Sequence, residues 1–326
     1  MKRILSLALC LALLLTLCSG CSKLPFGKGG ESSSALPSES KTEEKPAGPY
    51  KMGLLQFEES PAQDELREAF LSRLEEWGYD EKRLTIECEN AGGDKAKAKS
   101  ICEKFQKDGM GVIVATSSPA AEAAQETAKA GQAAVISIGG ADAAIQLKSG
   151  VPQTLALAVQ LDPDLKAIGL LTNGENDPAK KEVETFCEAH ELELVEAAFD
   201  GTGGSVTKAV EELSGKVSAF YTLPGTVSQS AGTEAARAAK EKKLAWYAGE
   251  AFLVKLGAMA AQTADLTEAG YEAADRAVRA MVGGTLPETA ALEATCLSLN
   301  QTTLDALAVT VPEELLEGAA LFRQES

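Results

Sequence analysis

Residues 52–78 read MGLLQFEESPAQDELREAFLSRLEEWG, and this stretch indicates the fold class. The apolar run Met52–Phe57 is short and is followed by polar residues, which is typical of a buried strand. Ser60-Pro61 then places an N-cap residue before a proline at the first helical position. A helix is expected over 61–78, because four apolar residues recur at helical spacing: Leu66, Phe70, Leu74 and Trp77. A strand followed at once by a helix is the first half of a β-α-β unit.

The same alternation continues along the chain. Further strands are expected at 84–88, 111–115 and 133–137, and further helices at 95–107 and 118–130. The pattern then restarts with strands at 166–172, 192–199, 219–222 and 244–248, and with helices at 178–190, 206–213 and 228–242. This order predicts an α/β fold with two Rossmann-like lobes, each a parallel sheet covered by helices on both faces. Two similar halves in one chain indicate a bilobed binding protein.

The composition excludes several classes of protein. The 326 residues include 31 Lys and Arg against 48 Asp and Glu, so the formal net charge is −17. Such a charge argues against a nucleic-acid partner, because phosphate contacts need clustered Lys and Arg. His190 is the single histidine, which excludes a multi-His metal site. Its place at the end of an expected helix favours a structural role there. We therefore expect no metal and no cofactor.

The N-terminus has the pattern of an export signal. Lys2 and Arg3 precede a largely apolar run, Ile4–Leu15, which is shorter than a membrane-spanning helix. The residues before Cys21 are small and resemble a bacterial lipobox, so 1–20 are expected to be a lipoprotein signal peptide with Cys21 lipidated. The alternative is an ordinary cleaved signal without lipid. Residues 21–49 are rich in Gly, Ser, Pro and charged residues and are expected to be a disordered tether.

Four cysteines remain in the expected globular part: Cys88, Cys102, Cys187 and Cys296. They show no CxxC spacing, so metal and redox functions are weakly supported. Export permits disulfides, and Cys88 and Cys102 lie in adjacent expected elements where they could form one. The alternative is that all four are free thiols buried as small apolar side chains.

A series of short motifs runs through the chain in a fixed order. They are 52–62 (MGLLQFEESPA), 76–79 (EWGY), 117–122 (SSPAAE), 163–171 (PDLKAIGLL), 255–258 (KLGA) and 309–316 (VTVPEELL). With these motifs the chain resembles the ABC-transporter substrate-binding lipoproteins of the tryptophan/tyrosine-binding type, which have the type I periplasmic-binding-protein fold. Two positions depart from the family pattern: the acid after the fourth strand is Asp142, one place late, and Pro224-Gly225 replaces an Asp-Asn pair.

The resemblance implies two lobes that close on a ligand by hinge motion. The N-lobe would comprise 50–149 plus 263–285, and the C-lobe 150–262 plus 286–326. The chain would cross between them near 149–151, 262–263 and 285–287.

Ligands of open parallel sheets bind beyond the carboxyl ends of the strands, which selects the candidate binding residues. Ser117 and Ser118 begin a helix, where backbone N–H groups can bind a ligand carboxylate; Ser118 could instead simply cap the helix. After the first strand, Gln56, Phe57 and Glu58 offer stacking and an acid for an ammonium group. The alternative is that Phe57 belongs to the core and Glu58 to the solvated surface.

The remaining candidates also follow strands. Gly139 and Gly140 would allow a ligand close to the backbone, or form a plain tight turn. The others are polar side chains in loops after strands: Asn173, Glu175, Thr222 and Glu250. The resemblance adds that Glu250 matches an acidic position of the family.

We expect a lipid-anchored receptor on the extracytoplasmic face of the cell membrane, serving an ABC importer with a permease and ATPase subunits. Its ligand would be a small amino acid-like molecule, and aromatic amino acids are among the candidates. The alternatives are the same fold binding a nucleoside or sugar, or a ligand sensor. An enzyme is not expected, because no nucleophile–base pair or metal-ligand cluster is found in the sequence.

Overall fold

The computed structural model describes residues 48–128, 133–140, 142–173 and 178–323. The predicted signal peptide, Cys21 and nearly all of the predicted tether therefore lie outside the described residues, as does Glu175. Among the helices that are described, none has both the length and the apolar character to cross a membrane.

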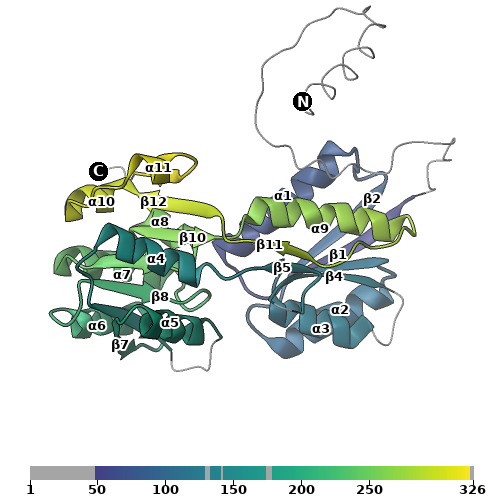
Figure 1. Cartoon of the computed structure of the whole chain (residues 1–326). Helices are drawn as coiled ribbons and strands as arrows, with labels where there is room; N and C mark the ends of the chain where they lie inside the picture. The colour runs from purple at the N-terminus through teal and green to yellow at the C-terminus, as the bar shows by residue number, and fades with distance from the viewer. Residues whose placement is uncertain (1–47, 129–132, 141, 174–177, 324–326) are drawn as a thin grey trace, which may run out of the picture. The chain divides into compact units, whose positions relative to one another are not determined.

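The first sheet has six strands in the order β11-β5-β4-β3-β1-β2, all parallel. Its helices cover both faces, with α1 and α9 on one and α2 and α3 on the other (Figure 1). The strands are β1 (Tyr50–Gln56), β2 (Leu84–Asn90), β3 (Val112–Ala115), β4 (Ala134–Gly139), β5 (Ile145–Leu147) and β11 (Ala290–Leu292). The helices are α1 (Pro61–Glu76), α2 (Lys95–Lys107), α3 (Ser118–Ala128) and α9 (Leu266–Met281).

The second sheet has seven strands in the order β13-β12-β10-β9-β8-β6-β7. One core cluster joins it to α4, α5, α10 and α11, and another joins it to α6, α7 and α8. The strands are β6 (Ala167–Thr172), β7 (Glu193–Ala198), β8 (Ala219–Thr222), β9 (Ala245–Ala248), β10 (Ala260–Thr263), β12 (Cys296–Asn300) and β13 (Ala320–Phe322). The helices are α4 (Val151–Leu161), α5 (Pro178–Ala189), α6 (Gly203–Leu213), α7 (Gln229–Lys242), α8 (Ala251–Leu256), α10 (Gln301–Leu307) and α11 (Glu313–Leu316).

The start and packing of α1 follow from its sequence. The Ser60 hydroxyl accepts a hydrogen bond from the Gln63 N–H at 3.3 Å, and a proline occupies the first helical position. The apolar stripe that includes Leu66 and Phe70 is buried against α9. A Cβ added to Gly270 of α9 would lie 2.7 Å from the Leu66 carbonyl oxygen, so the two helices approach closely only because this residue has no side chain.

The second sheet is not fully parallel, and this corrects the sequence prediction. Strand β12 runs antiparallel to β10, with Thr263 paired to Cys296. The chain leaves the second sheet for the first sheet at the C-terminal end of β10. It comes back from the first sheet into β12, whose first residue, Cys296, is paired with that end of β10. The returning strand must therefore run in the opposite direction.

The connections between the two sheets lie side by side. The Lys148 N–H donates to the Leu292 carbonyl at 2.9 Å, which joins the first connection to the third. A Cβ built on Gly150 would lie only 1.7 Å from the Gln262 carbonyl oxygen, so the first connection also presses against the end of β10. The predicted third crossing at 285–287 is wrong, because β11 pairs with β5 and extends the first sheet to residue 292.

The cysteines form no disulfide among the described residues. All four of Cys88, Cys102, Cys187 and Cys296 are free, so the Cys88–Cys102 bridge that the sequence permitted is not formed. Cys102 is buried in α2 whereas Cys88 is exposed on β2. The alternative of four buried thiols holds for Cys102 and Cys187 but not for Cys88, and Cys296 is half-buried.

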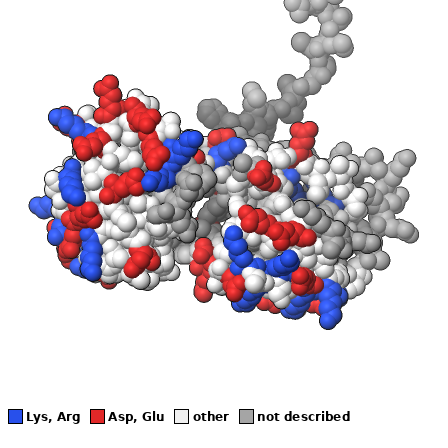
Figure 2. All heavy atoms as spheres, turned by 90° about the horizontal axis from the view of Figure 1, so that it is seen from below, with Lys and Arg blue, Asp and Glu red and all other residues white. Residues whose placement is uncertain are grey.

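Charged side chains of both signs are interspersed on the face shown in Figure 2. The acidic side chains thus alternate with basic ones, and no continuous basic track crosses the part of this face that the structure describes. A phosphate backbone would find no extended complementary surface there.

Candidate functional site

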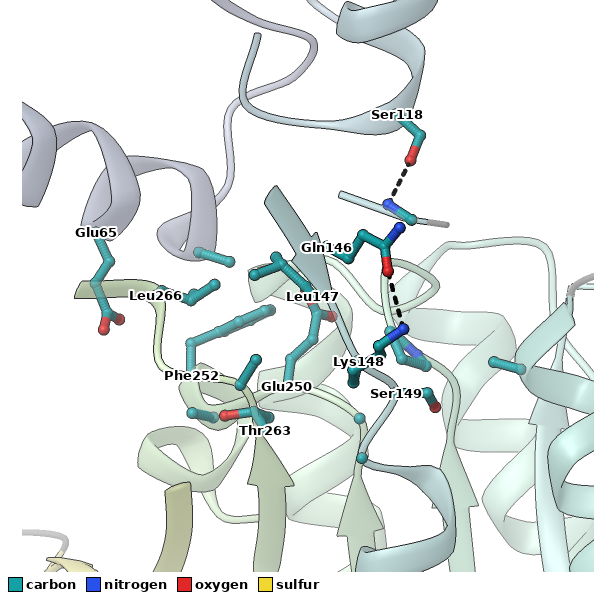
Figure 3. Close-up of a pocket in the computed structure, with 18 of the residues that line it drawn as sticks. Glu65, Ser118, Gln146, Leu147, Lys148, Ser149, Glu250, Phe252, Thr263 and Leu266 are labelled. Carbon is teal, nitrogen blue, oxygen red and sulfur yellow. Dashed lines mark hydrogen bonds between the residues drawn. The ribbon is translucent and has the colours of Figure 1, made fainter. Parts of the chain in front are cut away.

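A cavity of about 670 Å³, the first cavity, is lined by loops and helix ends from both sheets and by the connections between them. Figure 3 shows most of its lining residues. They are Ala62, Glu65, Ser118, Gly140, Gln146, Leu147, Lys148, Ser149, Gly150, Ala179, Glu182, Pro224, Gly249, Glu250, Ala251, Phe252, Thr263, Ala264 and Leu266. This volume lies within the range of small-molecule sites, ~300–1,000 Å³.

The apolar part of the first cavity is formed by Leu147, Phe252 and Leu266, which gather in one region of Figure 3. Its charged lining residues are Lys148 and three acids, among them Glu250. The Lys148 ammonium group donates to the Gln146 side-chain oxygen at 2.9 Å. The cavity therefore combines a wall suited to an apolar side chain with a net negative lining.

Glu250 is one of the three acids that line the first cavity. It lies at the N-cap position of α8, where its carboxylate oxygen accepts a hydrogen bond from the Gly225 N–H at 3.0 Å. Burial raises the pKa of Glu250 to about 7; the bond from Gly225 opposes this rise, and the nearby charge of Glu58 adds to it. A cationic ligand group beside Glu250 would favour its ionised form and bind strongly there.

The loop after β4 packs directly on the start of α3. The Ser118 hydroxyl accepts a hydrogen bond from the Gly140 N–H at 3.2 Å, drawn as a dashed line in Figure 3. Gly139 has φ +146°, and a Cβ there would lie 2.8 Å from the Ser118 hydroxyl, so this contact requires glycine. The Ser117 hydroxyl is buried and has no hydrogen-bond partner among the described residues. Of these four candidates, Ser118 and Gly140 line the first cavity.

The three candidates after β1 separate in the structure. Gln56 is buried, and its amide donates to Asp64 at 3.1 Å while its oxygen accepts from Arg67 at 2.7 Å. Phe57 packs against the core cluster of α2 and α3, as in the alternative stated for it. Neither residue lines the first cavity. Glu58 is exposed and lines a different space, described below.

Two candidates from the second sheet do not reach the first cavity either. Thr222 is completely buried, and its hydroxyl accepts a hydrogen bond from the Trp246 indole N–H at 3.0 Å. Asn173 is exposed after β6 but does not line this space. Glu250 thus lines the first cavity, whereas Thr222 and Asn173, which also follow strands, do not.

A second cavity of about 760 Å³ adjoins the first and shares Glu250 and Phe252 with it. Its lining is rich in hydroxyl and carboxyl groups. The residues are Glu58, Glu59, Ser60, Pro61, Asp64, Gly201, Gly225, Thr226, Val227, Ser228, Gln229, Ser230, Thr233, Glu250 and Phe252.

Sequence reasoning missed several lining residues. Lys148, Ser149 and Gly150 lie on the first connection between the sheets, and Thr263 and Leu266 lie around the second. The sequence signal for them was the expected crossing of the chain, since residues at a crossing must lie near both sheets. Among the described residues, no group of three or more His, Cys, Asp or Glu side chains could hold a metal ion.

Comparison with known families decides the class of protein. The family model described as "ABC transporter substrate binding protein" matches residues 51–322. The chain belongs to this family. The match spans both sheets and the residues of both cavities.

The chain is also similar to three individual proteins. It is 28% identical to a "Tyrosine-binding protein" of Clostridioides difficile, over 94% of this chain and 92% of the relative. A solved domain from Streptococcus pneumoniae, in complex with L-Trp, is similar at TM-score 0.69 and 20% identity, covering 84% of this chain and all of that one. A ligand-free, open substrate-binding protein with adhesive properties from Clostridium difficile is similar at TM-score 0.67 and 24% identity, covering 85% and 100%. The two solved structures support the fold.

Proposed function

We propose that this substrate-binding protein captures a small amino acid-like ligand in the first cavity, with aromatic amino acids as the leading class. The observation that carries the proposal is the chemistry of that cavity. Glu250 suits an ammonium group, and the start of α3 at Ser118 suits a carboxylate. Phe252, Leu147 and Leu266 suit an apolar or aromatic side chain.

The relative named as a tyrosine-binding protein supports the same ligand class. A sugar is less well matched, because sugar sites often combine aromatic faces with Asp and Asn. Among the described residues that line the first cavity, Phe252 is the one aromatic side chain, and neither Asp nor Asn is present.

A thermal-shift screen tests the ligand class. The unit from residue 46 onward, which is compact, would be screened against the amino acids, common sugars and nucleosides. Tyrosine or tryptophan should stabilise the folded state by RT ln(1 + [L]/Kd) and so raise the melting temperature. Stabilisation by a sugar or nucleoside alone would transfer the assignment to that class.

We also propose that the protein is anchored by a lipid on Cys21 at the extracytoplasmic membrane face, and that it delivers ligand to an ABC permease with ATPase subunits, without chemistry of its own. The support is the charged start, the apolar run and the small residues before Cys21, together with the family. Changing Cys21 to Ser should release the protein from membranes. A variant that stays membrane-bound would defeat the lipid anchor.

A further inference from the structure

The first turn of α1 lies between the two cavities. Ala62 and Glu65 line the first cavity, whereas Pro61 and Asp64 line the second. Each pair is three residues apart and therefore lies on one row of the helix surface. The two rows are neighbours, so this turn forms one side of the partition between the cavities.

The start of α8 forms the other side of the partition. Helices α1 and α8 contact each other, and Phe252, in the first turn of α8, lines both cavities. The loop after β8 divides in the same way, with Pro224 on the first cavity and Gly225 on the second.

The backbone around this partition is tightly packed. A Cβ on Gly249 would lie 2.6 Å from the Pro224 ring, and the Gly225 N–H is bonded to Glu250. These contacts fix the backbone just before α8, and therefore the position of Phe252 in its first turn. Phe252 itself packs against the core cluster of α6, α7 and α8 on one side and remains partly exposed. It is the largest side chain that both cavities share.

We propose that Phe252 is a specificity-determining residue that closes the first cavity against the second and so limits the ligand to a single amino acid. This inference rests on the proposed function. A ligand longer than one residue would need the space on the far side of Phe252. In the wild type the ring fills the passage, and truncation to Ala would join the two spaces.

The chain offers a matched control in Leu266. Leu266 lines the first cavity but not the second, so L266A enlarges the ligand site without opening the partition. F252L keeps much of the side-chain volume and is expected to keep most of the barrier. Because Phe252 is partly exposed, F252A should fold, and its melting temperature without ligand would verify this.

The experiment is calorimetric titration of the full chain with L-tyrosine, L-tryptophan, Gly-Tyr and Tyr-Gly. The measured quantity is the ratio of dipeptide to tyrosine Kd in the wild type, F252A, F252L and L266A. The wild type should bind tyrosine more tightly than either dipeptide. F252A should lower the ratio of dipeptide Kd to tyrosine Kd by ~10-fold, which is within the range over which an apolar pocket discriminates by size. The ratios of L266A and F252L should stay within about threefold of the wild type.

Three results would overturn the role of Phe252 while leaving amino acid binding intact. They are an unchanged ratio in F252A, an equal narrowing in L266A, and a wild type that binds a dipeptide as tightly as tyrosine. A wild type that binds neither tyrosine nor tryptophan would instead overturn the proposed function, and this inference with it.

Discussion

The affinity of this protein for an amino acid should depend on pH through Glu250. Burial raises the pKa of Glu250 to about 7, so the carboxyl group of the free protein is mostly protonated below that pH. A ligand ammonium group pairs with the ionised form, which means that binding must expel the proton in acidic solution. Affinity should therefore rise as pH increases from 5 and level off above about 7.

The size of the effect follows from the fraction of Glu250 that is ionised. With a pKa of about 7, about 1% is ionised at pH 5 and about 90% at pH 8. If the bound ligand holds the carboxylate ionised throughout, the apparent Kd should be about 100-fold weaker at pH 5 than at pH 8. That is about 2.7 kcal/mol of binding free energy. The α-ammonium group of the ligand stays charged over this range.

Titration calorimetry from pH 5 to 8 in two buffers of different ionisation enthalpy would measure both the affinity and the proton released. Glu250→Gln should bind more weakly at pH 8 and lose the pH dependence, since Gln cannot ionise but can still accept the bond from Gly225. A wild-type Kd that stays constant from pH 5 to 8 would show that ligand binding does not depend on ionisation of Glu250. So would the full pH dependence surviving in E250Q.

Three predictions concern stability, each measured by urea unfolding without ligand. The pKa of Glu250 is raised above its ordinary 4.5, so the folded state holds this proton more tightly, and stability is lost as pH rises from 4.5 to about 7. E250Q should therefore be more stable than the wild type at pH 8 by up to ~3 kcal/mol and equal to it at pH 4; equal stability at both would contradict this. Gly150→Ala should lower the free energy of unfolding by ~2–4 kcal/mol, because the added Cβ would collide with the Gln262 carbonyl oxygen. Gly204→Ala is the control: the space around this residue of α6 is open, so the substitution should stabilise the protein slightly. Equal effects of the two substitutions would contradict the predicted collision. Arg276→Met should cost ~3 kcal/mol, since this buried guanidinium bonds two backbone carbonyls of the segment before β11, and a neutral effect would show that those bonds contribute nothing.

Local sequence patterns predicted the elements that carry their own periodicity. Helix α1 was predicted from its apolar spacing and its N-cap within a few residues of its observed ends, because burial of one helix face is a local pattern. Strands β5, β11 and β13 have three residues each and were missed. Such short strands exist because a remote neighbour pairs with them, and a window of sequence contains no sign of that neighbour.

The candidate site was predicted in part for the same reason. Glu250 and Ser118 follow strands and do line the first cavity. Gln56 and Thr222 also lie at strand ends, but their side chains bond to Asp64, Arg67 and Trp246 inside the lobe. Which way a side chain points at a strand end depends on tertiary contacts. Phe252 and the residues of the first connection become cavity walls only when both sheets are assembled.

The route of the chain between the sheets also bears on how the protein is made. Helix α9 covers the face of the first sheet on which α1 lies, and its residues share a core cluster with Leu66 and Phe70. A ribosome must therefore synthesise about 280 residues before that face can be covered, and β11 emerges later still. The nascent chain keeps a large apolar surface unpaired until synthesis is nearly complete. It should accordingly remain a substrate for chaperones for most of its translation, and truncation before residue 266 should leave the first sheet unable to fold alone.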